Sequence, residues 1–172
     1  MSSPPRPRPI PPIYRLTLTT IEPVLAVAGA LQALLLPHIY TSTMTRGAVP
    51  YLAPAQFLYT GLAGGWLLLA FNEAVVLRFN FANDDNPALW RAMAGGMLLS
   101  DAATFHSAAQ AVGGWAAWVR VGEWEGADWM VFLTTVPFFV VRVMIVLGVG
   151  LQGTARRTRR RLDERAKMMI KM

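Results

Sequence analysis

The chain has 172 residues and no cysteine, which excludes disulfides, thiolate metal sites and cysteine nucleophiles. Charged residues are scarce at 15% of the sequence, whereas 54% of it is hydrophobic. This balance is too apolar for a soluble domain of this length. Gly-rich phosphate loops, nucleophile elbows and Walker-type patterns are also missing. We therefore expect a single membrane-embedded domain that uses no cofactor.

The surplus of basic residues is concentrated at one end of the chain. The formal net charge is +6, and half of the sixteen Lys and Arg residues follow Leu151. A basic tail next to an apolar helix is more typical of a topology and lipid-headgroup signal than of a nucleic-acid footprint. Membrane lipid is therefore an expected partner and nucleic acid is not.

Four apolar segments are each long enough to cross a ~30 Å hydrocarbon core, which takes ~20 helical residues. Helices are expected because the backbone polar groups in a bilayer must be satisfied within each segment. The sequence thus predicts an all-α transmembrane four-helix bundle over residues 13–151, between a Pro/Arg-rich disordered arm (1–12) and a basic cytosolic tail (152–172). The predicted spans are residues 16–36, 57–79, 90–115 and 129–151.

The distribution of Lys and Arg predicts the orientation of this bundle. Four spans place both termini on one side, and that side would carry thirteen of the basic residues. The opposite side would carry only Arg46 and Arg120, with Arg142 inside the fourth span. Positive loops and tails favour the cytosolic face, so both termini are predicted to be cytosolic.

Small residues at a spacing of four indicate how the helices pack. Gly61 with Gly65, and Gly96 with Ser100, form small-xxx-small pairs. Such pairs let helix backbones approach closely in lipid. We expect both pairs to lie at contacts between helices.

Four charged residues lie inside the predicted spans: Glu22, Glu73, Asp101 and Arg142. Each costs about 2.5–3.5 kcal/mol on insertion scales. At ~1.5 Å per residue, the two glutamates lie ~9 Å from the cytosolic boundary and the other two ~14–17 Å from it. One layer in the cytosolic half would hold all four, which predicts a shared site.

The chemistry of these four side chains suggests catalytic roles. Their formal charge is −2, and depth favours Asp101 as the partner of Arg142. A neutral carboxylic acid beside a carboxylate is suited to general acid/base catalysis. We assign Glu73 and Glu22 as proton donor and acceptor, Asp101 as an orienting or second acid, and Arg142 as the counter-ion.

Other polar residues in the spans are candidate ligand-binding groups: Asn72, Thr104, Gln32 and His106. Thr104 shares a helix face with Asp101, three residues before it, whereas His106 points substantially away. The sequence has only one other histidine, His38, and the two histidines show no metal-ligand spacing. No metal site is expected.

Several short motifs support a family resemblance over about residues 12–151. They are Ile21-Glu22-Pro23, Phe71-Asn72-Glu73-Ala74-Val75-Val76-Leu77-Arg78, Leu99-Ser100-Asp101, Asp128-Trp129, and Arg142 before Gly148-Val149-Gly150. With these, the chain resembles a family of small four-span membrane proteins from filamentous fungi, classified as a domain of unknown function. The resemblance implies four spans and an intracellular membrane of the endoplasmic-reticulum type. A looser similarity, in general arrangement alone, is to the sterol-isomerase and sigma-2-receptor-like fold.

Three functions are compatible with these features. The first is binding, or acid/base isomerisation or cyclisation, of an apolar small molecule, such as an isoprenoid or polyketide of secondary metabolism. The alternative is a non-enzymatic scaffold or accessory protein in which the charges hold the helices together. The second alternative is a non-haem metal-dependent oxygenase that uses His106, His38 and the acids. A homo-oligomer is compatible with all three.

Overall fold

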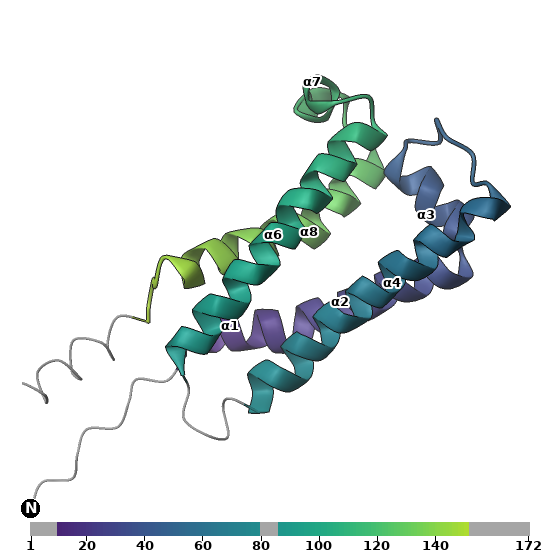
Figure 1. Ribbon diagram of the computed structural model, residues 1–172. Helices are drawn as coiled ribbons and strands as arrows, with labels where there is room; N and C mark the ends of the chain where they lie inside the picture. The colour runs from purple at the N-terminus through teal and green to yellow at the C-terminus, as the bar shows by residue number, and fades with distance from the viewer. Residues whose placement is uncertain (1–9, 80–85, 152–172) are drawn as a thin grey trace, which may run out of the picture.

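The computed structural model describes residues 10–79 and 86–151, and all regular secondary structure in these ranges is helical (Figure 1). The elements, in chain order, are α1 (Pro12–Leu16), η1 (Thr17–Ile21), α2 (Glu22–Leu35), α3 (Pro37–Met44), η2 (Ala53–Ala55), α4 (Gln56–Phe71), η3 (Asn72–Leu77), α6 (Pro87–Ala111), α7 (Trp115–Trp118), η4 (Val121–Glu123) and α8 (Gly126–Val146). Two of them, η1 and η3, are π-helical segments that continue the α-helices beside them.

Three of the resulting helices are long and apolar enough to cross a membrane: Pro12–Leu35, Ala53–Leu77 and Gly126–Val146. They correspond to the first, second and fourth predicted spans. The predicted third span forms α6, which has 25 residues but is not in this apolar set. The all-helical fold class is confirmed, and the structure shows three candidate spans within its described residues.

The helix boundaries differ from the predicted ones by a few residues. The first helix begins at Pro12, inside the predicted arm, because proline is favoured in the first turn of a helix. The third predicted span ends at Ala111 instead of residue 115, before two glycines with positive φ. The fourth ends at Val146 instead of residue 151, again before glycines with positive φ. The rest of the arm (1–9) and the tail (152–172) lie outside the described residues.

Helix α3 was not predicted, because Pro37 was interpreted only as the end of an apolar run. The chain turns at Leu36 (φ −134°), and Pro37 then starts a new helix. The hydroxyl oxygen of Thr41 lies 2.6 Å from the hydroxyl oxygen of Tyr59 on α4. This contact holds α3 against the second long helix.

The long helices form two pairs that meet at both ends. Helix α2 packs along α4, and α6 packs along α8. At one end η1 contacts η3 and α8, and at the other end α3 contacts α8 (Figure 1). We call these the near end and the far end. The first and last residues of the described chain both lie at the near end. There the Tyr14 hydroxyl donates a hydrogen bond to the Val149 carbonyl at 3.1 Å.

Small side chains form the fully buried centre of the interface between α2 and α4. Ala30, Ala33 and Ala63 are fully buried there. A Cβ atom on Gly29 would lie 2.4 Å from the ring of Trp66, so glycine is needed for the close approach. By contrast, a Cβ on Gly61, Gly65 or Gly96 would meet nothing within 4 Å. The prediction that the small-xxx-small pairs are packing contacts was therefore wrong for these glycines.

The far end is held by an ion pair between the segment after α3 and α8, and by a series of aromatic contacts. Arg46, after α3, donates to Asp128 at the start of α8, with Nε 3.0 Å from Oδ1. Asp128 and Glu125 also form a capping box that closes the first turn of α8. Aromatic rings connect α6, α7 and α8 around this end: Phe105, Trp115, Trp118, Trp124, Trp129, Phe132 and Phe139.

Candidate functional site: a buried arginine with three carboxyls

Arg142 on α8 contacts three carboxyl groups from the three other long helices. Its Nη1 donates to Asp101 Oδ1, and its Nη2 donates to Glu22 Oε1 and to Glu73 Oε1, the last at 3.1 Å. All four residues are buried, and Glu73 and Arg142 are 0% and 2% exposed. We call this set the carboxyl cluster. The prediction that depth brings these residues together agrees with the structure, and Arg142 contacts all three acids instead of Asp101 alone.

The carboxyl cluster contains more acid than its single cation can balance. The carboxyl groups of Glu22 and Glu73 both accept from Nη2 of Arg142, which brings the two acids to the same nitrogen atom. Each acid uses one oxygen toward Arg142. The remaining atoms, Glu22 Oε2, Glu73 Oε2, Asp101 Oδ2 and Arg142 Nε, are buried without a hydrogen-bond partner among the described residues. An unpaired buried polar group costs about 1–3 kcal/mol, so this arrangement is expensive for the fold alone.

The two glutamates are positioned by the π-helical segments. Glu22 directly follows η1, Glu73 is the second residue of η3, and the two segments pack against each other. A π-helical turn contains an extra residue and rotates the following side chains to another face. Such turns occur frequently at functional sites.

Proline and arginine explain how η1 is tolerated. Pro23 has no N–H to donate to the carbonyl of Thr19, four residues earlier. Arg78, just after η3, donates to this carbonyl from Nε at 3.1 Å and from Nη2 at 2.7 Å. The Arg78 side chain thereby satisfies the freed carbonyl and ties η1 to the end of the second long helix.

The carboxyl cluster forms one end of a cavity of about 320 Å³ between the two helix pairs. Glu22, Asp101 and Arg142 line it at the near end. Its wall further along is formed by apolar and uncharged polar residues from α2, α3, α4, α6 and α8: Leu25, Ala26, Ala28, Gly29, Gln32, Tyr40, Thr43, Met44, Trp66, Leu69, Ser100, Thr104, Met130, Val131, Thr134 and Thr135. A cavity of this composition fits an apolar molecule with a few polar groups.

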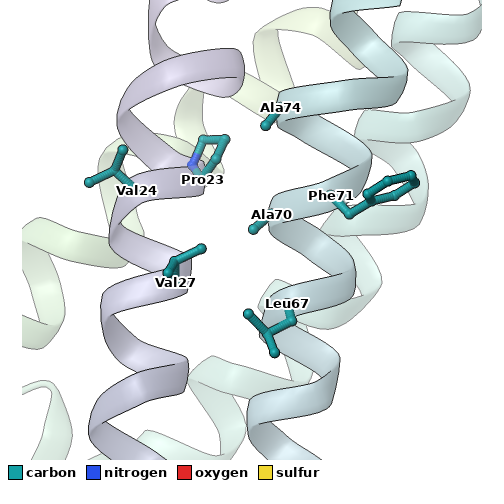
Figure 2. A pocket seen from close by; sticks show the side chains of 7 residues that line it. All are labelled: Pro23, Val24, Val27, Leu67, Ala70, Phe71 and Ala74. Carbon is teal, nitrogen blue, oxygen red and sulfur yellow. The ribbon is translucent and has the colours of Figure 1, made fainter.

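A second depression lies between α2 and α4, as Figure 2 shows. It is about 460 Å³ in volume and is lined only by apolar residues: Pro23, Val24, Val27, Leu67, Ala70, Phe71 and Ala74. None of these residues can take part in proton transfer. This groove is therefore suited to contact with hydrocarbon, not to chemistry.

Two of the four predicted ligand-binding residues line the cavity, and two do not. Gln32 and Thr104 are part of its wall, whereas Asn72 and His106 are not. His106 is exposed, and its ring lies 6.2 Å from that of Trp115. Tyr40, Thr134 and Thr135 also line the cavity and were missed. A spacing of seven residues between Thr135 and Arg142 was the one signal that could have indicated a shared helix face.

The donor set of the oxygenase hypothesis is not assembled in this part of the chain. No group of three or more His, Asp or Glu side chains is placed to hold a metal ion within residues 10–79 and 86–151. His38 and His106 are both exposed. The carboxyl cluster instead places an arginine where a metal ion would have to bind.

The fold and the site thus define a helical protein with membrane-spanning candidates and a buried arginine–carboxyl cluster. The chain belongs to the family described as Domain of unknown function (DUF7704), which matches residues 8–152. Comparison with curated proteins and with solved structures gives no match.

Proposed function

We propose that this chain is a multi-pass membrane protein that binds an apolar small molecule in the cavity and transfers protons at the carboxyl cluster. The observation that carries this proposal is the excess of carboxyl groups at the end of a cavity with apolar walls. A purely structural site would need one acid for its arginine, and this site has three.

The proposed topology has four spans, with α6 as a span in addition to the three candidates above, and both termini in the cytosol. In α6, Ser100, Asp101 and Thr104 line the cavity, so part of its polarity is directed to the protein interior. Polar residues in spanning helices characteristically face such cavities. The Lys and Arg residues of the arm and tail supply the positive-inside bias in the sequence, and the described chain begins and ends at the near end. At the far end, Arg46 and Arg120 are both paired with acids.

The chemistry we propose is acid/base isomerisation or cyclisation without a redox step. One proton shared between Glu22 and Glu73 turns their repulsion into a hydrogen bond. The protonated carboxyl donates this proton to one carbon of an alkene, and a neighbouring carboxylate removes a proton from another carbon, so the double bond moves and the protein regains its proton. Arg142 holds the carboxylates in place and balances their charge.

The test uses the full chain and nearly isosteric variants. Glu73→Gln and Asp101→Asn keep size and one acceptor oxygen but remove acid/base function. The lipid-soluble metabolites are compared among strains that carry the wild-type chain, one of these variants or a deletion. We expect the variant strains and the deletion strain to lack the same product. Asp128→Asn, in the far-end ion pair, is the matched control and should keep the product.

The same experiment separates catalysis from a structural role. The complete burial of Glu73 is the observation that favours the structural role. If the protein is a scaffold, Glu73→Gln should leave the metabolites unchanged, and any defect should follow the amount of folded protein in the membrane. Variants that fold normally with unchanged metabolites would overturn the proposed reaction.

A further inference from the structure

The apolar groove between α2 and α4 shares no residue with the cavity beside the carboxyl cluster. In Figure 2, Pro23, Ala70 and Ala74 point between the two helices, whereas Val24 and Phe71 point away on either side. Ala70 is 5% exposed, but Val24 and Phe71 are 64% and 55% exposed. The groove therefore has a floor of compact side chains and opens at the outer surface of two candidate spans.

Arg78 lies at the near end of this groove. It is about one helical turn beyond Ala74, and Thr20 on the other helix is about one turn before Pro23. Besides its bonds to the Thr19 carbonyl, Arg78 donates from Nη2 to the Thr20 hydroxyl at 3.0 Å, in an exposed contact. The guanidinium therefore bridges the same two helices that form the groove.

The charge of Arg78 is available for an anion. Among the residues that the structure describes, no acid forms an ion pair with Arg78, and its Nη1 donates to none of them. The Arg78 side chain is also exposed.

The position of Arg78 along the helix indicates which anion it would meet. Arg78 directly follows the candidate span Ala53–Leu77, so it lies near the level where the hydrocarbon core meets the lipid head groups. Lipid phosphate is found at that level, and guanidinium N–H groups form strong charge-assisted hydrogen bonds to phosphate.

We propose that the groove and Arg78 together bind a phospholipid with a net anionic head group. One acyl chain lies along Pro23, Ala70 and Ala74, and the phosphate accepts hydrogen bonds from Arg78. An apolar groove alone would contact any hydrocarbon, and an arginine alone would attract any anion. A phospholipid carries both groups in one molecule, and it already surrounds a membrane-spanning helix pair. This site is separate from the cavity, so the inference does not depend on the proposed reaction.

Native mass spectrometry of the full chain in detergent micelles tests this proposal with three lipids that have the same acyl chains. Dioleoylphosphatidylglycerol has a net negative head group, dioleoylphosphatidylcholine adds a cation beside its phosphate, and dioleoylglycerol has no phosphate. We expect a saturable 1:1 adduct with phosphatidylglycerol and about fivefold to tenfold weaker binding of the other two lipids. Equal binding of all three would overturn the proposal.

Variants of Arg78 test the contact with the phosphate. Arg78→Gln should reduce the binding of phosphatidylglycerol to that of phosphatidylcholine, whereas Arg78→Lys keeps the charge and should retain most of the preference. Arg91→Gln is the matched control, because Arg91 is an exposed arginine at the same end of the molecule. A purely structural role of Arg78 would leave the ratio between the two lipids unchanged in Arg78→Gln, and that result would overturn the proposal.

Variants of the groove test the position of the acyl chain. Ala74→Phe and Val27→Trp fill the groove from opposite helices, and each should weaken the phosphatidylglycerol adduct at least about fivefold. Ala103→Phe, at an exposed position of α6 outside the groove, should leave it unchanged. An adduct that survives both groove variants shows that the lipid binds elsewhere. If either variant instead converts a dimer into a monomer, a second copy of the chain occupies the groove, and the proposal is wrong.

Discussion

The two ends of this molecule each contain a contact between an arginine and buried acid, and the contacts differ in their balance of charge. At the far end Arg46 faces one acid, Asp128. Asp128 uses both of its oxygens, Oδ1 toward Arg46 and Oδ2 toward the backbone N–H of Glu125 at 2.8 Å. At the near end Arg142 faces three acids, and each of them keeps one oxygen unpaired among the described residues.

We interpret this difference as one between a structural role at the far end and the functional role proposed for the near end. The far-end acid closes the first turn of α8 and ties the segment after α3 to it, which accounts for its position. The near-end acids exceed what one guanidinium can balance, and two of them line a cavity. Burying surplus charge lowers stability, and this cost next to a cavity is the reason that we propose a ligand-binding and proton-transfer role for the carboxyl cluster.

The largest expected effect comes from removing the arginine at each end. Arg142→Met leaves three buried acids without a cation and should lower the free energy of unfolding by about 3–5 kcal/mol. Arg46→Met removes a contact whose arginine side chain is 20% exposed, and should cost about 1.5–3 kcal/mol. Denaturant unfolding of the protein in detergent micelles measures both. Equal losses would show that the two ends are energetically alike.

The second prediction concerns the cavity wall between the two ends. Gly29→Ala would push α2 away from Trp66 and should cost about 1–3 kcal/mol. Gly65→Ala is the matched control on α4, where a Cβ meets nothing within 4 Å. Alanine is the better helix former, so the control should gain up to about 1 kcal/mol. Unfolding in the same detergent compares the two, and a loss in both would contradict the packing described above.

A smaller difference is expected when one acid is made neutral at each end. Glu73→Gln removes surplus charge and keeps an acceptor for Arg142, so stability should change by less than about 1 kcal/mol or rise. Asp128→Asn weakens both an ion pair and a helix cap and should cost about 1 kcal/mol. Thermal unfolding of both variants measures this. The distinction between the ends fails if Glu73→Gln is the more destabilising change.

The smallest expected effect concerns the hydrogen bonds from Arg78 to Thr19. Arg78→Gln should cost about 0.5–1.5 kcal/mol and speed hydrogen exchange within η1, because the freed carbonyl loses its donor. Arg91→Gln is the control, since Arg91 donates to the Val146 carbonyl at the same end of the molecule but from another helix. Faster exchange in η1 for both variants would show that the effect is not specific to the π-helical segment.

Much of the fold follows from local sequence features. Apolar runs and proline positions indicated the long helices, although the ends were shifted where Pro12 starts a helix and where glycines such as Gly113 stop one early. Helix α3 escaped notice because proline both ends and begins helices, and its contacts with α4 and α8 come from distant parts of the chain. The sequence alone could not show which glycine packs, because Gly29 and Gly65 both lie in apolar stretches of long helices.

The carboxyl cluster was predictable in membership but not in geometry. The rise of a helix per residue placed Glu22, Glu73, Asp101 and Arg142 at similar depth, which was enough to predict a shared site. Depth along a helix leaves rotation about its axis open. The π-helical segments change that rotation near Glu22 and Glu73, so the arginine contacts all three acids.

The sequence by itself determined that this protein is helical, strongly apolar and built around a small set of charges, because hydropathy and helical rise are local properties. The tertiary structure decided that one arginine binds three carboxyls, that Gly29 faces Trp66, and that residues from five helices line the cavity beside the carboxyl cluster. These features depend on how side chains from distant segments pack, and no local pattern encodes that packing.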